Sequence, residues 1–306
     1  MAKIIDLDIV LPVIVEPVQP NTVDVGTPEI ISVGSSSIEV SQSFSSDVDY
    51  YGGIYVGESA DNNDDATLVK NPGYLNKTIT GLTSGTTYYV NGVGIPVLGN
   101  ITVGEQISVT TKQSPIPDEY QLVEYLEGNG TQYIYTGLKN ATYTGVKATV
   151  QLYAAESFCF GCYDNTWLFA GNDTNRFTAL CGNNSNDMVT YAGPIFDKIS
   201  FSLNYLNDNL FKPSFGNERY CGNAIMRSSS DIFLFCYNVL WNRRFYGKQQ
   251  IYEIHFSLAN QITRSFYPVY RKADNKPGMY DIVENQFYVN QGTDEFIVGP
   301  DKEWDE

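Results

Sequence analysis

The chain has 306 residues, of which 42% are hydrophobic and 18% are charged, and its formal net charge is −16. The hydrophobic content excludes an intrinsically disordered chain, and the length predicts two domains, or one large β domain with an attachment. Nucleic acids and anionic membranes need clustered basic residues, so an acidic balance of this size argues against both as partners.

The first 26 residues are predicted to form an extended arm, because Pro12, Pro17 and Pro20 disfavour a helix. Asp6 and Asp8 interrupt the apolar stretch, which is too short to cross a membrane, and no signal-peptide cleavage site follows it. Every odd position from 5 to 15 is apolar: Ile5, Leu7, Ile9, Leu11, Val13 and Val15. An extended backbone with this pattern carries one apolar face.

An apolar face is costly in water, so we expect the arm to be covered by a partner protein or by a second copy of this chain. Strand addition is the natural mode of contact, because backbone groups pair with an open sheet edge while alternate side chains fill pockets. The alternative is that the arm forms an edge strand of its own neighbouring domain.

Beyond the arm, the hydrophobic pattern has a period of two, and helical periodicity is nearly absent. Segments rich in β-branched and aromatic residues occur at 36–44, 87–95, 105–112, 146–153, 232–239, 251–258 and 295–300. Clusters of Gly, Asn, Asp and Pro separate these segments, which predicts short strands joined by turns. The fold class is therefore predicted to be all-β, built from sandwiches or barrels.

Residues 27–112 contain the run GLTSGTTYYV, from Gly81 to Val90, which resembles the fibronectin type III signature. The resemblance implies an immunoglobulin-like sandwich in which Tyr88 is the tyrosine of the corner before strand F. Gln42 stands where that family usually has a tryptophan, so the core must be filled differently. The resemblance also places three residues in the core or on strand B: Leu82, Ile38 and Val40.

Residues 113–117 are predicted to be a linker stiffened by two prolines, and residues 118–306 a larger β domain. Two motifs, YQLVEYLEGNGTQYIYTGL (120–138) and FYPVYRKADNKPGMYDIVENQFYVNQGTDEFIVGP (266–300), resemble a domain of phage and prophage proteins related to concanavalin-like or laminin-G-like jelly rolls. The resemblance implies a jelly-roll sandwich. Arm, fibronectin-like module and jelly roll in this order resemble virion surface proteins of tailed phages, including the crAss-like group.

Concanavalin-like folds include glycoside hydrolases, which place two carboxylates on one face of a strand. Their Glu-x-Asp-x-x-Glu string is missing here, and the nearest pair, Asp281 and Glu284, has the pattern of a turn. The single histidine, His255, lies in IYEIHFSL, where strict alternation puts it on the same face as Ile251 and Glu253. No G-x-S-x-G elbow presents a serine to it, so we predict no catalytic residue.

Cys159 and Cys162 form a C-x-x-C, but neither a second pair nor suitably spaced histidines accompany them, so they are predicted to fill the core. The acidic loop at 61–66 opens like an EF-hand loop, but Ala66 replaces its glycine and Pro72 its final glutamate. A solvated loop is predicted there, with a weak surface calcium site as the alternative. No cofactor and no resident metal are expected.

Two predicted loops, 164–176 and 238–244, combine asparagines with an aromatic side chain that could stack on a pyranose. The possible glycan contacts are Trp167 in the first loop and Trp241 in the second. The alternative is that the asparagines serve turns and the aromatic residues serve the core.

The expected function is that of a non-enzymatic structural protein on the surface of a phage virion, made in the cytoplasm of the bacterial host. As a head fibre or capsid decoration protein, it would bind a capsid or auxiliary capsid protein through the arm. The fibronectin-like module would be a spacer, and the jelly roll would face outward. The resemblance implies a homodimer or homotrimer. The alternative function is a tail fibre or adhesin that binds host surface glycan through the jelly roll.

Overall fold

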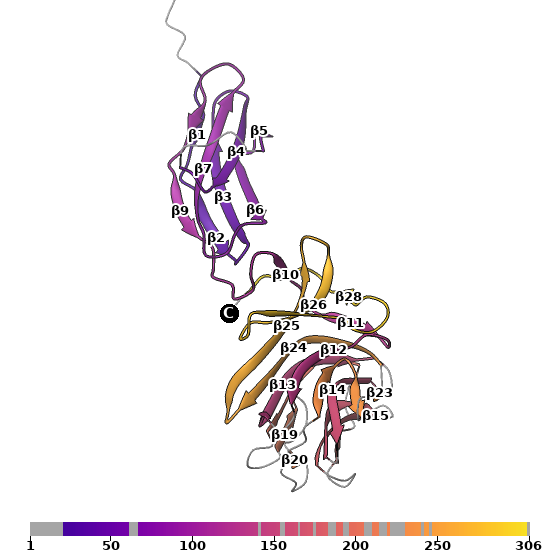
Figure 1. The fold of residues 1–306 in the computed structure, drawn as a ribbon. Helices are drawn as coiled ribbons and strands as arrows, with labels where there is room; N and C mark the ends of the chain where they lie inside the picture. Colours follow the sequence, from indigo (N-terminus) through magenta and orange to yellow (C-terminus); the bar gives the residue numbers. More distant parts are fainter. Residues whose placement is uncertain are drawn as a thin grey trace, which may run out of the picture. The chain divides into compact units, whose positions relative to one another are not determined.

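The structure, a computed structural model, describes residues 21–60, 67–139, 142–153, 157–164, 166–173, 176–182, 188–191, 196–204, 210–213, 219–220, 230–239, 242–244 and 247–304. Every named element in these residues is a β-strand, so the predicted all-β fold class is confirmed (Figure 1). No helix in them is long and apolar enough to cross a membrane. The chain divides into two compact units, which we call unit 1 (Met1–Lys112) and unit 2 (Gln113–Glu306).

Unit 1 is built from two antiparallel sheets. Its strands are β1 (Asp24–Val25), β2 (Glu29–Val33), β3 (Ser37–Ser45), β4 (Tyr50–Gly57), β5 (Val69–Lys70), β6 (Tyr74–Thr80), β7 (Thr87–Pro96), β8 (Thr102–Val103) and β9 (Ile107–Thr110). In one sheet β3 pairs with β1, β2 and β6. In the other, β7 pairs with β4, β8 and β9, and β5 is added to the outer edge of β4.

The core of unit 1 contains side chains from both sheets. Its buried members are Ile38, Val40, Ile54, Tyr88 and Val90, and Leu82 packs against them. Ile38 and Val40, which were predicted to lie on a strand, are on β3, and Leu82, which was predicted in the core, packs against it. The hydroxyl of Tyr88 accepts a hydrogen bond from the backbone N–H of Thr83 at 2.8 Å, which is the contact expected of a tyrosine corner.

Gln42, which stands where the fibronectin type III family usually has a tryptophan, lies in the core. It is buried on β3, and its side-chain amide donates to the carbonyl oxygens of Gly26 at 2.6 Å and Ser43 at 3.1 Å. The opposite sheet approaches it closely at Gly92, where a Cβ would lie only 2.6 Å from the Gln42 side chain. A smaller side chain is thus accommodated because the two backbones come together, and its amide nitrogen is satisfied by backbone oxygens.

The last residues of the predicted arm belong to unit 1. Val23 is buried, and Asp24–Val25 forms β1, which pairs with the end of β3. The alternative in which the arm supplies an edge strand therefore holds for these residues. The six apolar residues of the arm, Ile5 to Val15, lie outside the described residues, as does the acidic loop at 61–66.

The two ends of unit 1 carry different connections. At one end, the backbone N–H of Lys112 donates to the Gly34 carbonyl at 2.9 Å, and the chain continues from there into unit 2. At the other end, a Cβ at Gly99 would collide with the backbone oxygen of Asn21, the first described residue of the arm. β7 runs between these ends, and its ten residues span about 30 Å. Asn21 and Lys112 therefore lie at opposite ends of unit 1.

Unit 2 is built from two larger sheets. The first comprises β10 (Tyr120–Leu122), β11 (Leu126–Asn129), β13 (Gly145–Leu152), β18 (Ile199–Asn204), β19 (Leu210–Pro213), β20 (Arg219–Tyr220), β24 (Lys248–Leu258), β25 (Gln261–Arg271), β26 (Lys276–Asp281), β27 (Gln286–Val289) and β28 (Ile297–Val298). Its main strand order is β20-β19-β18-β13-β24-β25-β26-β27. β10 pairs with β25, whereas β11 pairs with β24 and β28. We call this the large sheet.

The second sheet of unit 2 comprises β12 (Ile134–Lys139), β14 (Ser157–Asp164), β15 (Thr166–Asp173), β16 (Arg176–Gly182), β17 (Met188–Tyr191), β21 (Asp231–Leu234), β22 (Tyr237–Val239) and β23 (Asn242–Arg244). Its main strand order is β12-β21-β14-β15-β16-β17. β22 also pairs with β14, in parallel, and with β23.

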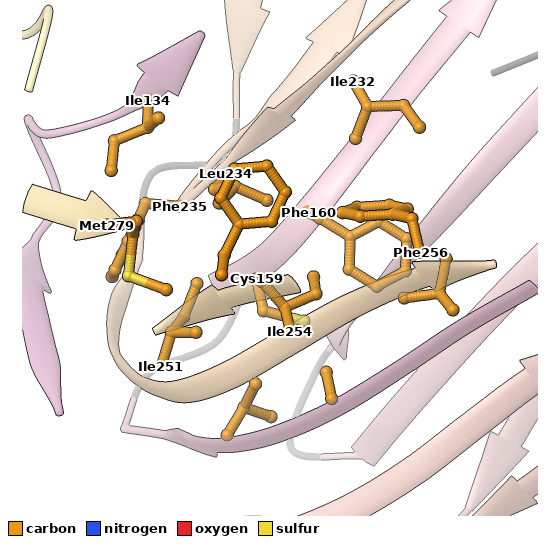
Figure 2. Packing of buried hydrophobic residues seen from close by; sticks show 14 of the residues in the cluster. Ile134, Cys159, Phe160, Ile232, Leu234, Phe235, Ile251, Ile254, Phe256 and Met279 are labelled. Atoms are coloured by element: carbon orange, nitrogen blue, oxygen red, sulfur yellow. The ribbon is translucent and has the colours of Figure 1, made fainter. Parts of the chain in front are cut away.

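The main core of unit 2 contains side chains from both of its sheets. Figure 2 shows Phe160 of β14 and Phe256 of β24 within it, and their ring centroids are 6.0 Å apart in an edge-to-face arrangement. From β13 the even-numbered residues are buried in this core: Val146, Ala148, Val150 and Leu152. The odd-numbered residues of β13 therefore lie on the opposite face of the large sheet.

Two expectations about the strands of unit 2 are wrong. On β24, a register shift leaves Tyr252 as an extra residue against β13, so Ile251 lies in the core with Ile254 instead of sharing the face of Glu253. The strand expected at 232–239 is two strands, because the chain turns at Phe235, whose φ is 62°. Its backbone N–H bonds to the Cys159 carbonyl at 2.9 Å there.

A smaller hydrophobic cluster covers part of the outer face of the large sheet, the face opposite the main core. Its buried members are Ile116, Leu122, Val269, Tyr280 and Trp304, and we call it the clasp cluster. Ile116 comes from the predicted linker and Trp304 from near the C-terminus, so both ends of unit 2 meet here. The Lys302 N–H also donates to the Leu122 carbonyl at 2.9 Å.

Candidate functional site

Beside the clasp cluster, the outer face of the large sheet carries a row of polar side chains from four strands. We call it the polar row: Ser200 of β18, Thr149 of β13, Glu253 and His255 of β24, and Ser265 of β25. Thr149 pairs with both Ser200 and Glu253 in register, and His255 pairs with Ser265. Residues that are opposite one another or two apart on strands share a face, which is why these side chains meet.

Hydrogen bonds connect the polar row. A carboxylate can only accept, so the Thr149 hydroxyl donates to Oε1 of Glu253 at 2.9 Å. Thr149 has a single proton, so the Ser200 hydroxyl donates to Thr149 across their 2.9 Å contact. On the other side, Nε2 of His255 lies 3.6 Å from Oε2 of Glu253, and Nδ1 lies 2.7 Å from the Ser265 hydroxyl.

These contacts keep Glu253 ionised. The hydrogen bond to His255, followed by that from Thr149, lowers the pKa of the Glu253 carboxyl to about 2, although burial opposes the shift. The side chain remains 28% exposed. Glu253 is therefore a fixed negative charge that is held by neighbouring groups on both oxygens and still reaches solvent.

A cleft of about 430 Å³ opens over the polar row. Its lining residues are Leu122, Val123, Glu124, Thr149, Lys198, Ser200, Tyr252, Glu253, Tyr267, Asp301 and Lys302. The Lys198 ammonium lies 3.7 Å from the Glu124 carboxylate and 3.8 Å from the centroid of the Tyr252 ring. Burial raises the pKa of Tyr252 to about 12, so its phenol stays neutral.

Ser265, His255 and Glu253 make the contacts of an acyl-transfer triad, but the serine is not exposed to a substrate as such a triad requires. Ser265 is 4% exposed and His255 is 6% exposed, and Ser265 lies within the long strand β25 rather than on a sharp turn. A substrate carbonyl does not reach a hydroxyl buried in this way. These three residues therefore organise the sheet face and the charge of Glu253.

Of the two predicted glycan contacts, the structure describes only the backbone of Trp167. Trp167 lies on β15, which pairs with β14 and β16 on its two sides, so the loop expected at 164–176 is wrong over most of its length. An aromatic and apolar run, TWLFAG, forms a paired strand there because both edges find partners. Trp241 lies outside the described residues.

The cysteines of the C-x-x-C both pack in the main core of unit 2. Burial raises the pKa of the Cys159 thiol to about 12, so it is a poor nucleophile and a poor metal ligand. Cys236 is buried in a separate small cluster with Tyr133 and Phe233. Among the described residues, no group of three or more His, Cys, Asp or Glu side chains is arranged to hold a metal ion.

No model of a protein family matches this chain, and no curated protein is significantly similar to it in sequence.

Sequence reasoning missed the cleft, although one signal was available. Lys147, Thr149 and Gln151 alternate with apolar residues on β13, as do Ser200 and Ser202 on β18. Such alternation marks a sheet with one face away from the core. It does not reveal which strands are neighbours, and Glu253 joins Thr149 only because β24 pairs with β13.

Because the pKa of Glu253 is lowered in the folded protein, we expect the free energy of unfolding to fall in acid. Its carboxyl has an ordinary pKa of 4.5 and a folded-state pKa of about 2. A lowered pKa stabilises the folded state fully above pH 4.5, and this contribution is lost as the pH falls through about 2. We expect wild type to lose about 2–3 kcal/mol more than Glu253→Gln between these limits. Urea unfolding at pH 5 and pH 2 measures this difference, and equal losses in the two proteins would contradict it.

Proposed function

We propose that this chain is a non-enzymatic structural protein of a phage virion, a head fibre or capsid decoration protein. The arm anchors it to a capsid or auxiliary capsid protein, unit 1 is a spacer, and unit 2 is displayed outward. It acts at the virion surface after synthesis in the host cytoplasm. A dimer or trimer is part of this proposal.

The topology of both units supports the proposal. In unit 1, one sheet contains β2, β3 and β6 and the other contains β4, β5, β7 and β9. Together with the Tyr88 contact, this pairing fits a fibronectin type III-like module. In unit 2, two large and mainly antiparallel sheets around one core fit a concanavalin-like or laminin-G-like jelly roll.

The observation that carries the proposal is the apolar tip of unit 1 at the end where the arm begins. The turn between β7 and β8 exposes Val97, Leu98 and Ile101, and Leu98 is 75% exposed. Gly99, in the same turn, touches the backbone of Asn21. We propose that the apolar residues of the arm and this tip contact the same partner, because the first described residue of the chain, Asn21, lies beside the tip. The chain leaves unit 1 at the opposite end of this unit, at Lys112, as a spacer requires.

Particle incorporation tests this anchor. We expect deletion of residues 1–20 to abolish incorporation into virions. Replacing both Leu98 and Ile101 by aspartate should lower incorporation about 10-fold or more, because two apolar side chains no longer desolvate favourably in the contact. The protein content of purified particles measures both effects.

Val283→Asp is the matched control for the tip, since Val283 is also exposed but lies in unit 2. Its incorporation should equal that of wild type. Undiminished incorporation of the deletion variant would contradict the anchor proposal, and equal losses for the tip and control variants would contradict the role of the tip.

A second candidate function is attachment to a host surface glycan through unit 2, as in a tail fibre or adhesin. The observation that favours it is the cleft over the polar row, which is large enough for a small ligand and combines aromatic, hydroxyl and charged side chains.

A further inference from the structure

We infer that the cleft on the outer face of the large sheet binds a neutral saccharide, with Glu253 as its central hydrogen-bond acceptor. This inference rests on the second candidate function, glycan attachment through unit 2. It places the site on the polar row rather than at Trp167 and Trp241.

Glu253 is suited to accept hydrogen bonds from ligand hydroxyl groups. Oε1 accepts from the Thr149 hydroxyl and Oε2 faces the His255 ring, whereas each carboxylate oxygen has two acceptor positions. The carboxylate is ionised at any neutral pH and remains partly exposed to the cleft. Because its neighbours already fix its orientation, little conformational entropy is lost when a ligand binds.

The charges around the cleft favour a neutral ligand. The lining holds three carboxylates and two ammonium groups. Lys198 offsets Glu124 at 3.7 Å, and Asp301 and Lys302 are adjacent in the chain. Since three carboxylates are nearly balanced by two ammonium groups, no concentrated field of one sign attracts an ion. The same mixture of carboxylates and ammonium groups supplies both acceptors and donors, which matches hydroxyl groups that both donate and accept.

The shape and the aromatic wall favour a pyranose among neutral polar ligands. The volume of about 430 Å³ is in the range of small-molecule sites. Tyr267 lines the cleft and supplies an aromatic wall, whereas Leu122 and Val123, which also line it, are almost completely buried. Lys198 already lies over the Tyr252 ring, so the apolar C–H face of the sugar is expected against Tyr267. The hydroxyl edge would then face Glu253 and Ser200.

Saturation-transfer NMR and titration calorimetry on the full chain test this assignment. The probes are the methyl pyranosides of glucose, galactose, mannose, rhamnose, N-acetylglucosamine and N-acetylgalactosamine, with glucosamine and methyl sialoside as charged comparisons. We expect at least one neutral probe to bind. Glu253→Gln should weaken its binding about 10-fold or more, because a charged acceptor is lost.

Glu295→Gln is the matched control, since Glu295 is an ion-paired carboxylate of unit 2 that is not part of the cleft lining. Its affinity should equal that of wild type. Lys198→Ala is the second test variant, because Lys198 is exposed at the rim and its loss leaves the sheet intact. It should weaken binding by about 3-fold or more.

Three results would overturn the assignment of the cleft, and they differ in whether they also contradict glycan attachment through unit 2. If wild type binds a probe and both cleft variants bind it equally well, the cleft is wrong but glycan attachment stands. If a charged probe binds in preference, the neutral class is wrong. If no probe binds and a glycan array shows no binding either, both the cleft assignment and glycan attachment are contradicted. The proposed virion anchor does not depend on this result.

Discussion

Replacing Trp304 with alanine is expected to destabilise unit 2 by about 3–5 kcal/mol, the usual cost of removing a large buried aromatic side chain. Trp304 is almost completely buried, and its ring meets that of Tyr267 edge to face with centroids 4.9 Å apart. Trp304 follows three residues after Asp301, which forms an isolated antiparallel bridge with Val123. The indole thus holds the C-terminal segment against β10 and β25.

Differential scanning calorimetry of the full chain measures this effect. The two units are compact, and the larger unfolding enthalpy belongs to unit 2 because enthalpy scales with the number of residues. We expect the Trp304→Ala variant to shift this larger transition and to leave that of unit 1 in place. Trp304→Phe keeps most of the apolar contact and should cost about half as much. A shift in the unit 1 transition, or none in unit 2, would contradict the role of the clasp cluster.

Asp281→Ala is expected to destabilise unit 2 by about 3–5 kcal/mol, because it leaves a buried guanidinium without its counter-charge. Asp281 is fully buried at the end of β26, and its Oδ2 contacts Nε of Arg264. Oδ1 accepts from the backbone N–H groups of Ser265 at 2.9 Å and Val283 at 3.1 Å. The side chain therefore ends the strand, shapes the following turn and neutralises Arg264 at once.

The chain offers a matched control in a second arginine–aspartate pair. Arg271 and Asp274 make an ion pair of 2.7 Å, but both side chains are more than 40% exposed. Solvent screens such a pair, so Asp274→Ala should cost less than about 1 kcal/mol. Denaturant unfolding of both variants gives the comparison. Equal destabilisation by the two substitutions would show that burial is not the source of the Asp281 effect.

The turn expected at Asp281 and Glu284 is present between β26 and β27. Its sequence pattern, however, did not reveal that Asp281 is the buried partner of Arg264. That pairing depends on β25 and β26 lying side by side, with the two residues on neighbouring strands. Local pattern identifies the turn, because turn residues act over a few positions, whereas the ion pair depends on a longer-range contact.

The cleft illustrates the same limit. Thr149, Ser200 and Glu253 each sit in a segment whose alternation predicts a strand with one outward face. What brings them together is the order β18-β13-β24, in which β24 follows β13 by about a hundred residues of chain. The bulge at Tyr252 then decides which face Ile251 takes, and no period-two pattern contains that information.

The sequence by itself determined that this protein is all-β and acidic throughout, with apolar residues at alternate positions from Ile5 to Val15. These properties follow from alternation and composition, which act residue by residue. Only the tertiary structure decided that Ile116 and Trp304 meet on the outer face of the large sheet, that Asn21 lies beside the apolar tip of unit 1, and that Glu253 is an ionised group in a cleft. Each of these depends on which distant strands pair, and strand pairing is a property of the folded chain as a whole.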